Sequence, residues 1–310
     1  MLSVIKRIEA VAFKFSNKMV WSNVYGLART LLAIGTLLTL IFNDNSVLFG
    51  SQQKSISFFT SGLEVNKFTL FYFLRYHLVV AKSIAILILL IVASGWRPRL
   101  TCLFHWYIAI SFELFCVVPD GGDQVTSVLA FLLIPICLLD NRKWQWDKKY
   151  NYGTPYKNLI AYSTYWIIRI QVAVIYLDAA TEKFKVSEWT NGTILWFVMN
   201  DPIMGFNNIL RPILLPVIKQ PFFLGIFSWS VLILEFSLFL GLGMDKVNRK
   251  RLLIVGILFH LSIVFLHGLI SFFFAMTSAL ILYLQPWEQP FLFLEGFNLK
   301  NIKFNKILKR

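Results

Sequence analysis

The sequence Tyr165-Trp-Ile-Ile-Arg-Ile-Gln-Val-Ala-Val-Ile-Tyr-Leu-Asp-Ala-Ala-Thr-Glu-Lys183 is the most informative stretch of the chain. It has the length and apolar character of a membrane-spanning helix and so indicates the class of fold. Within it, Arg169, Tyr176 and Lys183 recur every seven residues, which is nearly two helical turns, so their side chains share one face. A guanidinium at bilayer depth costs at least about 2.5 kcal/mol unless it faces protein or water. This face is therefore the first place to look for a functional site.

The composition of the whole chain agrees with a membrane protein. Of its 310 residues, 57% are hydrophobic and 16% aromatic, and the mean hydropathy is +0.65, which is too apolar for a soluble protein of this length. The net charge of +14 comes from short basic clusters between apolar runs, a pattern typical of loops beside anionic lipid. We therefore expect the lipid bilayer as a partner, and no nucleic acid.

Eight apolar stretches have roughly the length of a membrane crossing, and they predict an all-α, polytopic membrane helical bundle. The last two are joined so closely that they form either a tight helical hairpin, which we favour, or a re-entrant pair. The stretches are Val24–Phe42, His77–Gly95, Leu100–Val118, Gln124–Leu139, Leu159–Ala179, Pro221–Gly243, Leu252–His267 and Leu269–Leu284.

The loop charges predict the orientation of this bundle. Most of the 30 lysines and arginines fall in segments that lie on one side if the stretches alternate, so the N-terminus and C-terminus are expected in the cytoplasm. The pattern predicts a single domain over residues 1–310. Its non-spanning parts are an amphipathic segment at 1–20, outer loops at 43–76 and 180–220, and a basic cytoplasmic tail at 286–310.

Familiar catalytic motifs are absent from the sequence. It contains no nucleotide-binding glycine loop, no His-Glu-x-x-His and no Cys-x-x-Cys. His260 and His267 are seven residues apart and share a helix face, but no third ligand accompanies them at helical spacing, so no metal site is predicted. The three cysteines are expected to serve packing.

Polar residues within or beside the spans indicate a polar cavity that opens outward, because ionisable groups at membrane depth need partners or water. Lys183 ends the shared helix face at the outer boundary, where it acts either as a base or ligand group or as a snorkelling anchor. The candidate catalytic residues are Lys183, Asp123, Tyr176 and Arg169, and the candidate cavity residues are Gln171, Asp178, Glu113, His260, His267, Glu235 and Arg29.

Several short motifs resemble the HTTM family, the membrane domain shared with vitamin K-dependent gamma-carboxylase. Its central signature is similar to a run that includes Arg169-x-Gln171, Tyr176-x-x-Ala179-x-x-x-Lys183 and Trp189-x-x-Gly192. Other elements follow in the family's order, and the resemblance covers nearly the whole chain from Met19 to Leu284. These are Tyr25-Gly-Leu-Ala-Arg29, Gly95-Trp-Arg97-Pro-Arg99, Gly121-Gly122-Asp123, Phe259-His260 and Phe273-Phe274-Ala-Met276.

The resemblance implies a role for Lys183, whose counterpart in the carboxylase deprotonates vitamin K hydroquinone; a quinone or hydroquinone cofactor is thus an expectation. Where the carboxylase has a histidine beside its lysine, this chain has Asp123. A carboxylate favours the charged ammonium, whereas a base must be neutral, so the substitution weakens the case for quinone chemistry. Glutamyl carboxylation is not expected, since the large lumenal domain that helps the carboxylase bind its substrates is lacking.

In length and in its 43–76 insertion, the chain looks like the sporulation-delaying (SdpB-like) group of bacterial members. That likeness implies a multi-pass protein of the bacterial cytoplasmic membrane that helps convert a secreted precursor into an antimicrobial peptide, with a small accessory maturation protein. Two alternatives stay open: a quinone-linked membrane oxidoreductase, and a non-catalytic transporter, channel or immunity-type protein. The sequence leaves open whether Lys183 transfers protons or only binds the precursor.

Overall fold

The computed structural model of the chain describes residues 20–50, 67–147, 154–202 and 205–295, and every regular element within these ranges is a helix. Most of the predicted amphipathic segment at 1–20, half of the predicted outer loop at 43–76 and most of the predicted basic tail lie outside the described residues. The helices are α2 (Asn23–Phe42), α3 (Asn45–Phe49), α5 (Leu70–Phe73), α6 (Leu78–Ser94), α7 (Pro98–Phe115), α8 (Gly121–Leu132), α9 (Ile134–Leu138), α10 (Pro155–Phe184), α11 (Ser187–Thr190), α12 (Ile194–Asn200), α13 (Arg211–Ile218), α14 (Pro221–Leu240), α15 (Lys246–His267), α16 (Ile270–Leu284) and α17 (Leu292–Glu295).

Each of the eight predicted apolar stretches coincides with a helix, although the fourth is divided into α8 and α9. Helices α2, α10, α14 and α15 are long and apolar enough to cross a membrane, while α6 and α16 are shorter apolar helices. The all-helical membrane class is therefore confirmed. Eight crossings and the cytoplasmic position of both termini stay predictions, as does the single domain.

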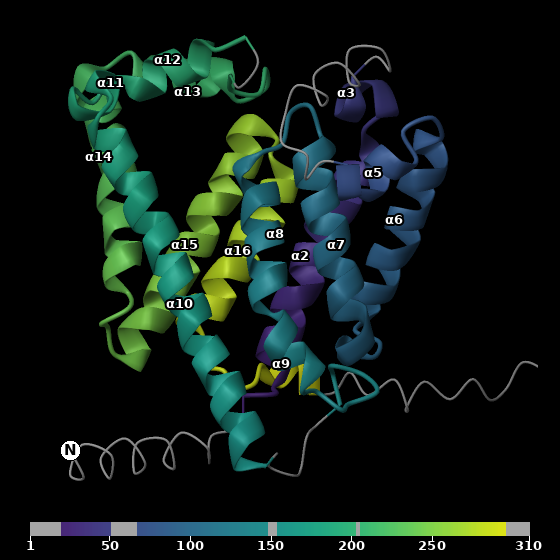
Figure 1. Cartoon of the computed structure of the whole chain (residues 1–310). Helices are drawn as coiled ribbons and strands as arrows, with labels where there is room; N and C mark the ends of the chain where they lie inside the picture. The colour runs from purple at the N-terminus through teal and green to yellow at the C-terminus, as the bar shows by residue number, and fades with distance from the viewer. Residues whose placement is uncertain (1–19, 51–66, 148–153, 203–204, 296–310) are drawn as a thin grey trace, which may run out of the picture.

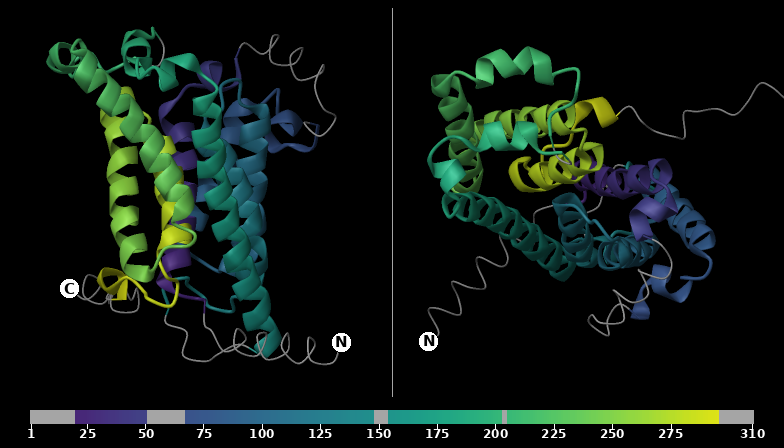
Figure 2. Two further views of the ribbon diagram at one scale, coloured as in Figure 1. Left: turned by 90° about the vertical axis from the view of Figure 1, so that its left-hand side faces the viewer. Right: turned by 90° about the horizontal axis from the view of Figure 1, so that it is seen from above.

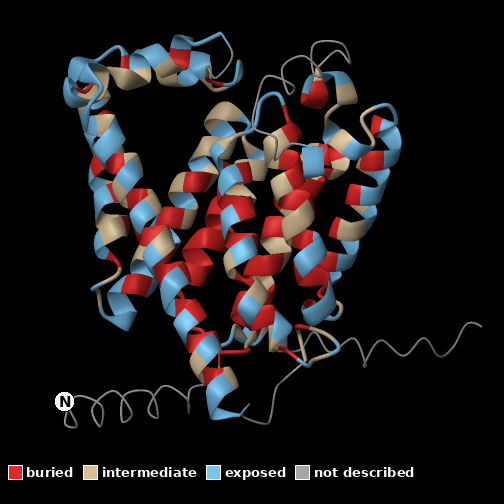
Figure 3. Ribbon diagram, in the orientation of Figure 1, coloured by how far each residue is buried: buried red, intermediate tan, exposed pale blue. Residues whose placement is uncertain are grey.

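Helix α2 lies at the centre of the bundle, where it packs against α6, α8 and α16 (Figures 1 and 3). Of its most apolar window 67% is buried, compared with 22% for α14 and 17% for α15, so the rest of the described protein leaves most of the surface of the latter two uncovered. Small residues permit the close packing: a Cβ on Gly35 would lie 3.1 Å from the carbonyl oxygen of Ser271, and the Ser278 hydroxyl donates to the Ala28 carbonyl at 2.8 Å.

The last two apolar stretches form two helices joined by a short turn, and whether both cross the membrane stays a prediction. Helix α15 ends at Gly268, whose φ of 76° is in the left-handed region that glycine tolerates, and α16 begins at Ile270. The two helices pack against each other along their lengths.

Helices α10 and α14 diverge from α8, α15 and α16 toward one end of the molecule, and α11, α12 and α13 lie across that end (Figures 1 and 2). We call residues 187–218, which carry these three short helices, the cap. The Asn207 amide donates to the Leu266 carbonyl at 2.7 Å, and the Ser228 hydroxyl donates to the Gly192 carbonyl at 3.0 Å, so hydrogen bonds tie the cap to α15 and α14. The predicted outer loop at 180–220 is thus an ordered helical layer.

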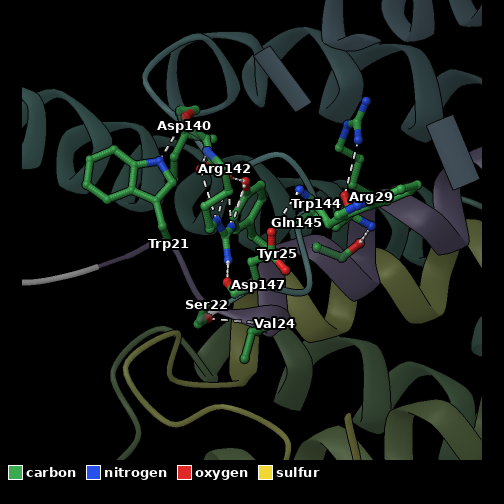
Figure 4. Close-up of polar contacts among 12 residues, drawn as sticks. Trp21, Ser22, Val24, Tyr25, Arg29, Asp140, Arg142, Trp144, Gln145 and Asp147 are labelled. Carbon is green, nitrogen blue, oxygen red and sulfur yellow. Dashed lines mark hydrogen bonds and ion pairs between the residues drawn. The ribbon is translucent and has the colours of Figure 1, made fainter. Parts of the chain in front are cut away.

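The opposite end of the bundle holds the first and last described segments together. Asn23 donates from its side-chain amide to the Phe291 carbonyl at 2.9 Å and accepts from the Phe291 amide at the same distance. Beside it, Asp140 accepts three hydrogen bonds from the Arg142 guanidinium, the shortest at 2.7 Å, one from the Arg142 backbone amide, and a further one from the Tyr25 hydroxyl (Figure 4). This contact fixes the loop after α9 against the start of α2.

Arg29 lies near this opposite end and is absent from the lining of the large cavity described below, which corrects the prediction made for it. Its guanidinium donates to Gln145 at 3.1 Å and to the Thr101 hydroxyl, and Gln145 in turn donates to the Gly26 carbonyl at 2.9 Å (Figure 4). Neutral side chains therefore bind both terminal nitrogens of the buried guanidinium, while its Nε has no partner among the described residues. These hydrogen bonds hold the loop after α9, which carries Gln145, against α2, and Arg29 joins α2 to α7.

A methyl group on Gly95 is expected to damage this network. Gly95 has a φ of 81°, and a Cβ there would lie 2.5 Å from Cγ of Gln145, so Gly95→Ala combines backbone strain of about 1–2 kcal/mol with a displaced Gln145. We expect the thermal unfolding midpoint of the detergent-purified protein to fall by several degrees, measured by intrinsic fluorescence. Gly225→Ala is the matched control, since nothing lies within 4 Å of a Cβ at that position in α14. Equal midpoints for the two variants would contradict the assignment.

Candidate functional site

A large cavity occupies the space where α10 and α14 diverge from α8, α15 and α16, and the cap forms its roof. Its volume is about 1320 Å³, its surface is mostly apolar, and it is open rather than enclosed. Apolar walls come from α8, α10, α14, α15, α16 and the cap, with Val128, Ile175, Val231, Phe259 and Phe272 among them. The few polar side chains in this wall are therefore the candidate functional groups.

Lys183 and Glu235 form an ion pair in the cavity wall, between the end of α10 and the middle of α14. The Lys183 ammonium donates to Oε1 of Glu235 at 2.8 Å and to the Ala179 carbonyl at 3.3 Å, and it lies 5.5 Å from the ring centroid of Trp189 in the cap. The lysine side chain is 24% exposed and the glutamate 9%. A lysine bound in this way is positioned by three elements rather than extended freely toward an interface.

Tyr176 and His260 form a second polar pair, which joins α10 to α15. The Tyr176 hydroxyl lies 3.0 Å from Nε2 of His260, and both residues are almost fully buried. No other polar partner of the Tyr176 hydroxyl is found among the described residues. The hydroxyl therefore donates its proton to Nε2 of His260. The neutral imidazole then carries its own proton on Nδ1.

Two buried polar atoms of these pairs have no partner among the described residues: Oε2 of Glu235 and Nδ1 of His260. An unsatisfied buried polar atom costs about 1–3 kcal/mol, so such atoms are uncommon in packed cores and call for an explanation. Here one is an acceptor and the other, with the proton on Nδ1, a donor. Both belong to residues that line the cavity.

The cavity brings together most of the candidates predicted from the sequence. The residues of that set which line it are Lys183, Tyr176, Gln171, Asp178, Glu235, His260 and His267. Trp189 and Gln124 line it as well, and neither is among the candidate site residues predicted from the sequence. Trp189 stands in the quoted family signature, which is the signal that could have identified it.

The carboxylate beside Lys183 is Glu235. The prediction that Asp123 lies there is wrong. Asp123 caps α8: its side chain accepts from the Asp120 amide at 3.1 Å, and Asp120 accepts from the Asp123 amide at 2.9 Å. Glu113 also lies outside the cavity lining and accepts a hydrogen bond from Ser127. Neither residue contacts the polar pairs.

Arg169 shares the helix face of Tyr176 and Lys183 but lies beyond the cavity, among helix ends. Its Nε donates to the Tyr283 carbonyl at 3.0 Å and its Nη2 reaches the Leu242 carbonyl at 3.5 Å, while its guanidinium lies 4.5 Å from the Trp166 ring centroid. These carbonyls lie at or just beyond the C-terminal ends of α16 and α14, where the helix dipole favours a cation. The geometry thus gives Arg169 a structural contact in place of the predicted catalytic one.

Metal ligands are not grouped in the described part of the chain, where no three His, Cys, Asp or Glu side chains come together. His267 contacts Phe206 of the cap, with 5.3 Å between ring centroids, and so lies apart from the Tyr176 pair. The ionisable and amide side chains of the cavity are thus one ion pair, one phenol–imidazole pair, Asp178, His267, Gln124 and Gln171.

The four helices long and apolar enough to span a membrane, together with the polar residues in an apolar cavity, define a helical membrane protein with a cavity between its helices. No family model matches the chain, and no solved structure matches it. The chain is 37% identical over 275 residues to sporulation-delaying protein SdpB of Bacillus subtilis (strain 168), covering 87% of this chain and 83% of SdpB. It is also 33% identical over 291 residues, 94% of each protein, to the uncharacterized protein YitO of the same organism. The chain belongs to the SdpB family.

Proposed function

We propose that this protein acts in the maturation or export of a secreted antimicrobial peptide, and that the precursor of the peptide occupies the cavity. The observation that carries the proposal is the kinship with a sporulation-delaying protein along most of the chain. The cavity supports it, because a volume of about 1320 Å³ exceeds the roughly 300–1,000 Å³ typical of sites for small molecules. The proposal places the protein in a bacterial cytoplasmic membrane with the cap outside, and it includes a small accessory maturation protein as a partner.

Within this proposal, the Lys183–Glu235 pair is the reactive or binding centre. The pair can exchange a proton with a bound chain, or it can orient a polar group of that chain, because both partners lie in the cavity wall. Tyr176 and His260 line the same cavity and supply a second proton donor and acceptor.

Replacement of Lys183 by alanine tests the proposal. We expect Lys183→Ala to abolish active peptide in the culture medium while the protein is still found in the membrane, because the ammonium in the cavity is lost. The measurement is growth inhibition of a sensitive strain by the medium, with the membrane level followed by immunoblot. The matched control is Lys185→Ala, which removes an exposed lysine paired with Glu182 at 2.5 Å outside the cavity. Full peptide output from the Lys183 variant would refute the proposed role.

A quinone-linked oxidoreductase is the second candidate, favoured by the apolar cavity wall around a lysine. The residues fit a quinol: Lys183, Glu235 and His260 would hold its hydroxyls, and the bound quinol would supply two electrons and two protons. Purified protein should then consume added quinol in air. The Glu235 contact weighs against this candidate, since a carboxylate favours the charged lysine over the neutral base.

A channel or transporter receives less support from the structure. Such a protein would need polar groups along a continuous path, yet Arg29 and His105 are 1% and 2% exposed and do not line the cavity. Around Arg29 of α2 and His105 of α7 the helices are therefore packed against each other.

A further inference from the structure

The charge of the cavity wall restricts what it can accept. Lys183 is neutralised by Glu235, and Arg169 of α10 and Arg249 of α15, although buried in helices that line the cavity, are absent from its lining. Asp178, the other carboxylate of the wall, is exposed. A ligand with a charged group at the centre would therefore bring an uncompensated charge into mostly apolar surroundings. The wall favours an uncharged ligand.

The hydrogen-bonding groups of the wall restrict the ligand further. Oε2 of Glu235 is an acceptor and Nδ1 of His260 a donor, and neither has a partner among the described residues. Both atoms are buried as they stand, so a small rotation of either side chain is needed to present them to a ligand in the cavity. The side-chain amides of Gln124 and Gln171 also line the cavity, and each offers a donor and an acceptor. A peptide backbone presents one donor and one acceptor at every residue, whereas a lipid chain presents none and a quinol presents only two hydroxyls. The set of groups matches a peptide.

The position of the cavity indicates how such a ligand arrives. The cap lies across the end where the cavity helices diverge (Figures 1 and 2), and the cavity is partly open. Gln124 and Val128 of α8 and Ile175 and Asp178 of α10 all line the cavity, and the two residues of α8 are exposed. Helix α10 diverges from α8 toward the cap (Figure 1), and we place ligand entry between these two helices.

We propose that the cavity binds an uncharged, apolar peptide segment that enters from the bilayer between α8 and α10 and is held through its backbone by Glu235, His260, Gln124 and Gln171. The inference deepens the proposed function by naming the kind of segment recognised, and it rests on that function only in taking a peptide as the substrate. The protein would then recognise the segment by its backbone groups and by its lack of charged side chains, and not by a particular sequence.

The experiment uses the full chain in lipid nanodiscs and a synthetic peptide of Leu, Ala and Gly with blocked ends and a photoreactive group. We expect saturable cross-linking, with the sites found by mass spectrometry in α8, α10 and α14. One central lysine in the peptide should weaken binding about tenfold. His260→Phe removes the free donor and should weaken it roughly fivefold, the equivalent of one ordinary hydrogen bond.

Entry is tested by filling the space between α8 and α10. We expect Val128→Trp to weaken cross-linking about tenfold, while Val80→Trp, a substitution of an exposed valine of α6 outside the cavity lining, leaves it unchanged. A thermal midpoint measured for each variant shows that it is folded.

Three results would overturn the inference: cross-linking that does not saturate, equal binding of the neutral and lysine-containing peptides, or equal cross-linking of the Val128 and Val80 variants. Displacement of the peptide by a short-chain quinol at low concentration would also overturn it, in favour of a small ligand. Should peptide output in culture still depend on Lys183 in any of these cases, the proposed function stands and the inference alone fails.

Discussion

Asp140→Ala is expected to remove most of the protein from the membrane fraction. Asp140 is fully buried, and it is the carboxylate that binds the buried guanidinium of Arg142 with a shortest distance of 2.7 Å. Its loss leaves that charge unpaired, and breaking a buried ion pair in this way costs about 3–5 kcal/mol. The Tyr25 hydroxyl loses its acceptor at the same time. Because whole domains are stable by only about 5–15 kcal/mol, the variant should accumulate poorly and unfold far below the parent.

Asp44→Ala is the matched control, since Asp44 is exposed and its side chain makes no capping hydrogen bond at the start of α3. Membrane levels are compared by immunoblot, and unfolding midpoints by fluorescence after purification in detergent. A variant of Asp140 as abundant and stable as that of Asp44 would mean that the network in Figure 4 contributes little to folding.

The sequence predicted the helices well because the signals for them are local. Runs of apolar residues of bilayer length define α2, α6, α7, α10, α14, α15 and α16 without knowledge of their neighbours. The shared face of Arg169, Tyr176 and Lys183 was also predicted correctly: all three contact α14, α15 or α16, since seven residues return the chain to the same side of a helix.

The partners of these residues depend on tertiary packing, and there the predictions were less successful. Glu235 lies 52 residues from Lys183, and only the packing of α14 against α10 brings them together. Arg29 was expected to face a polar cavity because a buried guanidinium needs partners, yet Gln145 and Thr101 provide them within packed protein. The assignment of Asp123 was avoidable, since Asp120 and Asp123 are spaced as the two residues of a capping box.

A double substitution in the cavity, Lys183→Met with Glu235→Leu, is expected to separate the stability of the ion pair from its function. Lys183→Met alone leaves the largely buried Glu235 carboxylate unpaired, and because the lysine is 24% exposed we expect the lower end of the roughly 3–5 kcal/mol cost of breaking a buried pair. Replacing both partners by apolar residues of similar length removes the charge altogether. Such exchanges are often neutral, or stabilising by about 1–4 kcal/mol.

The double variant should therefore regain the unfolding midpoint of the parent while peptide output in the culture medium stays absent. Both quantities are measured on the same set: the parent, each single variant and the double variant. If the ion pair serves only to hold α10 against α14, peptide output must recover together with the midpoint, since the apolar pair restores the packing. Recovery of both would therefore exclude a functional role for Lys183 and Glu235. Recovery of the midpoint alone would mean that the cavity needs the ammonium and the carboxylate for what they do to a bound chain, because the fold is then intact without them.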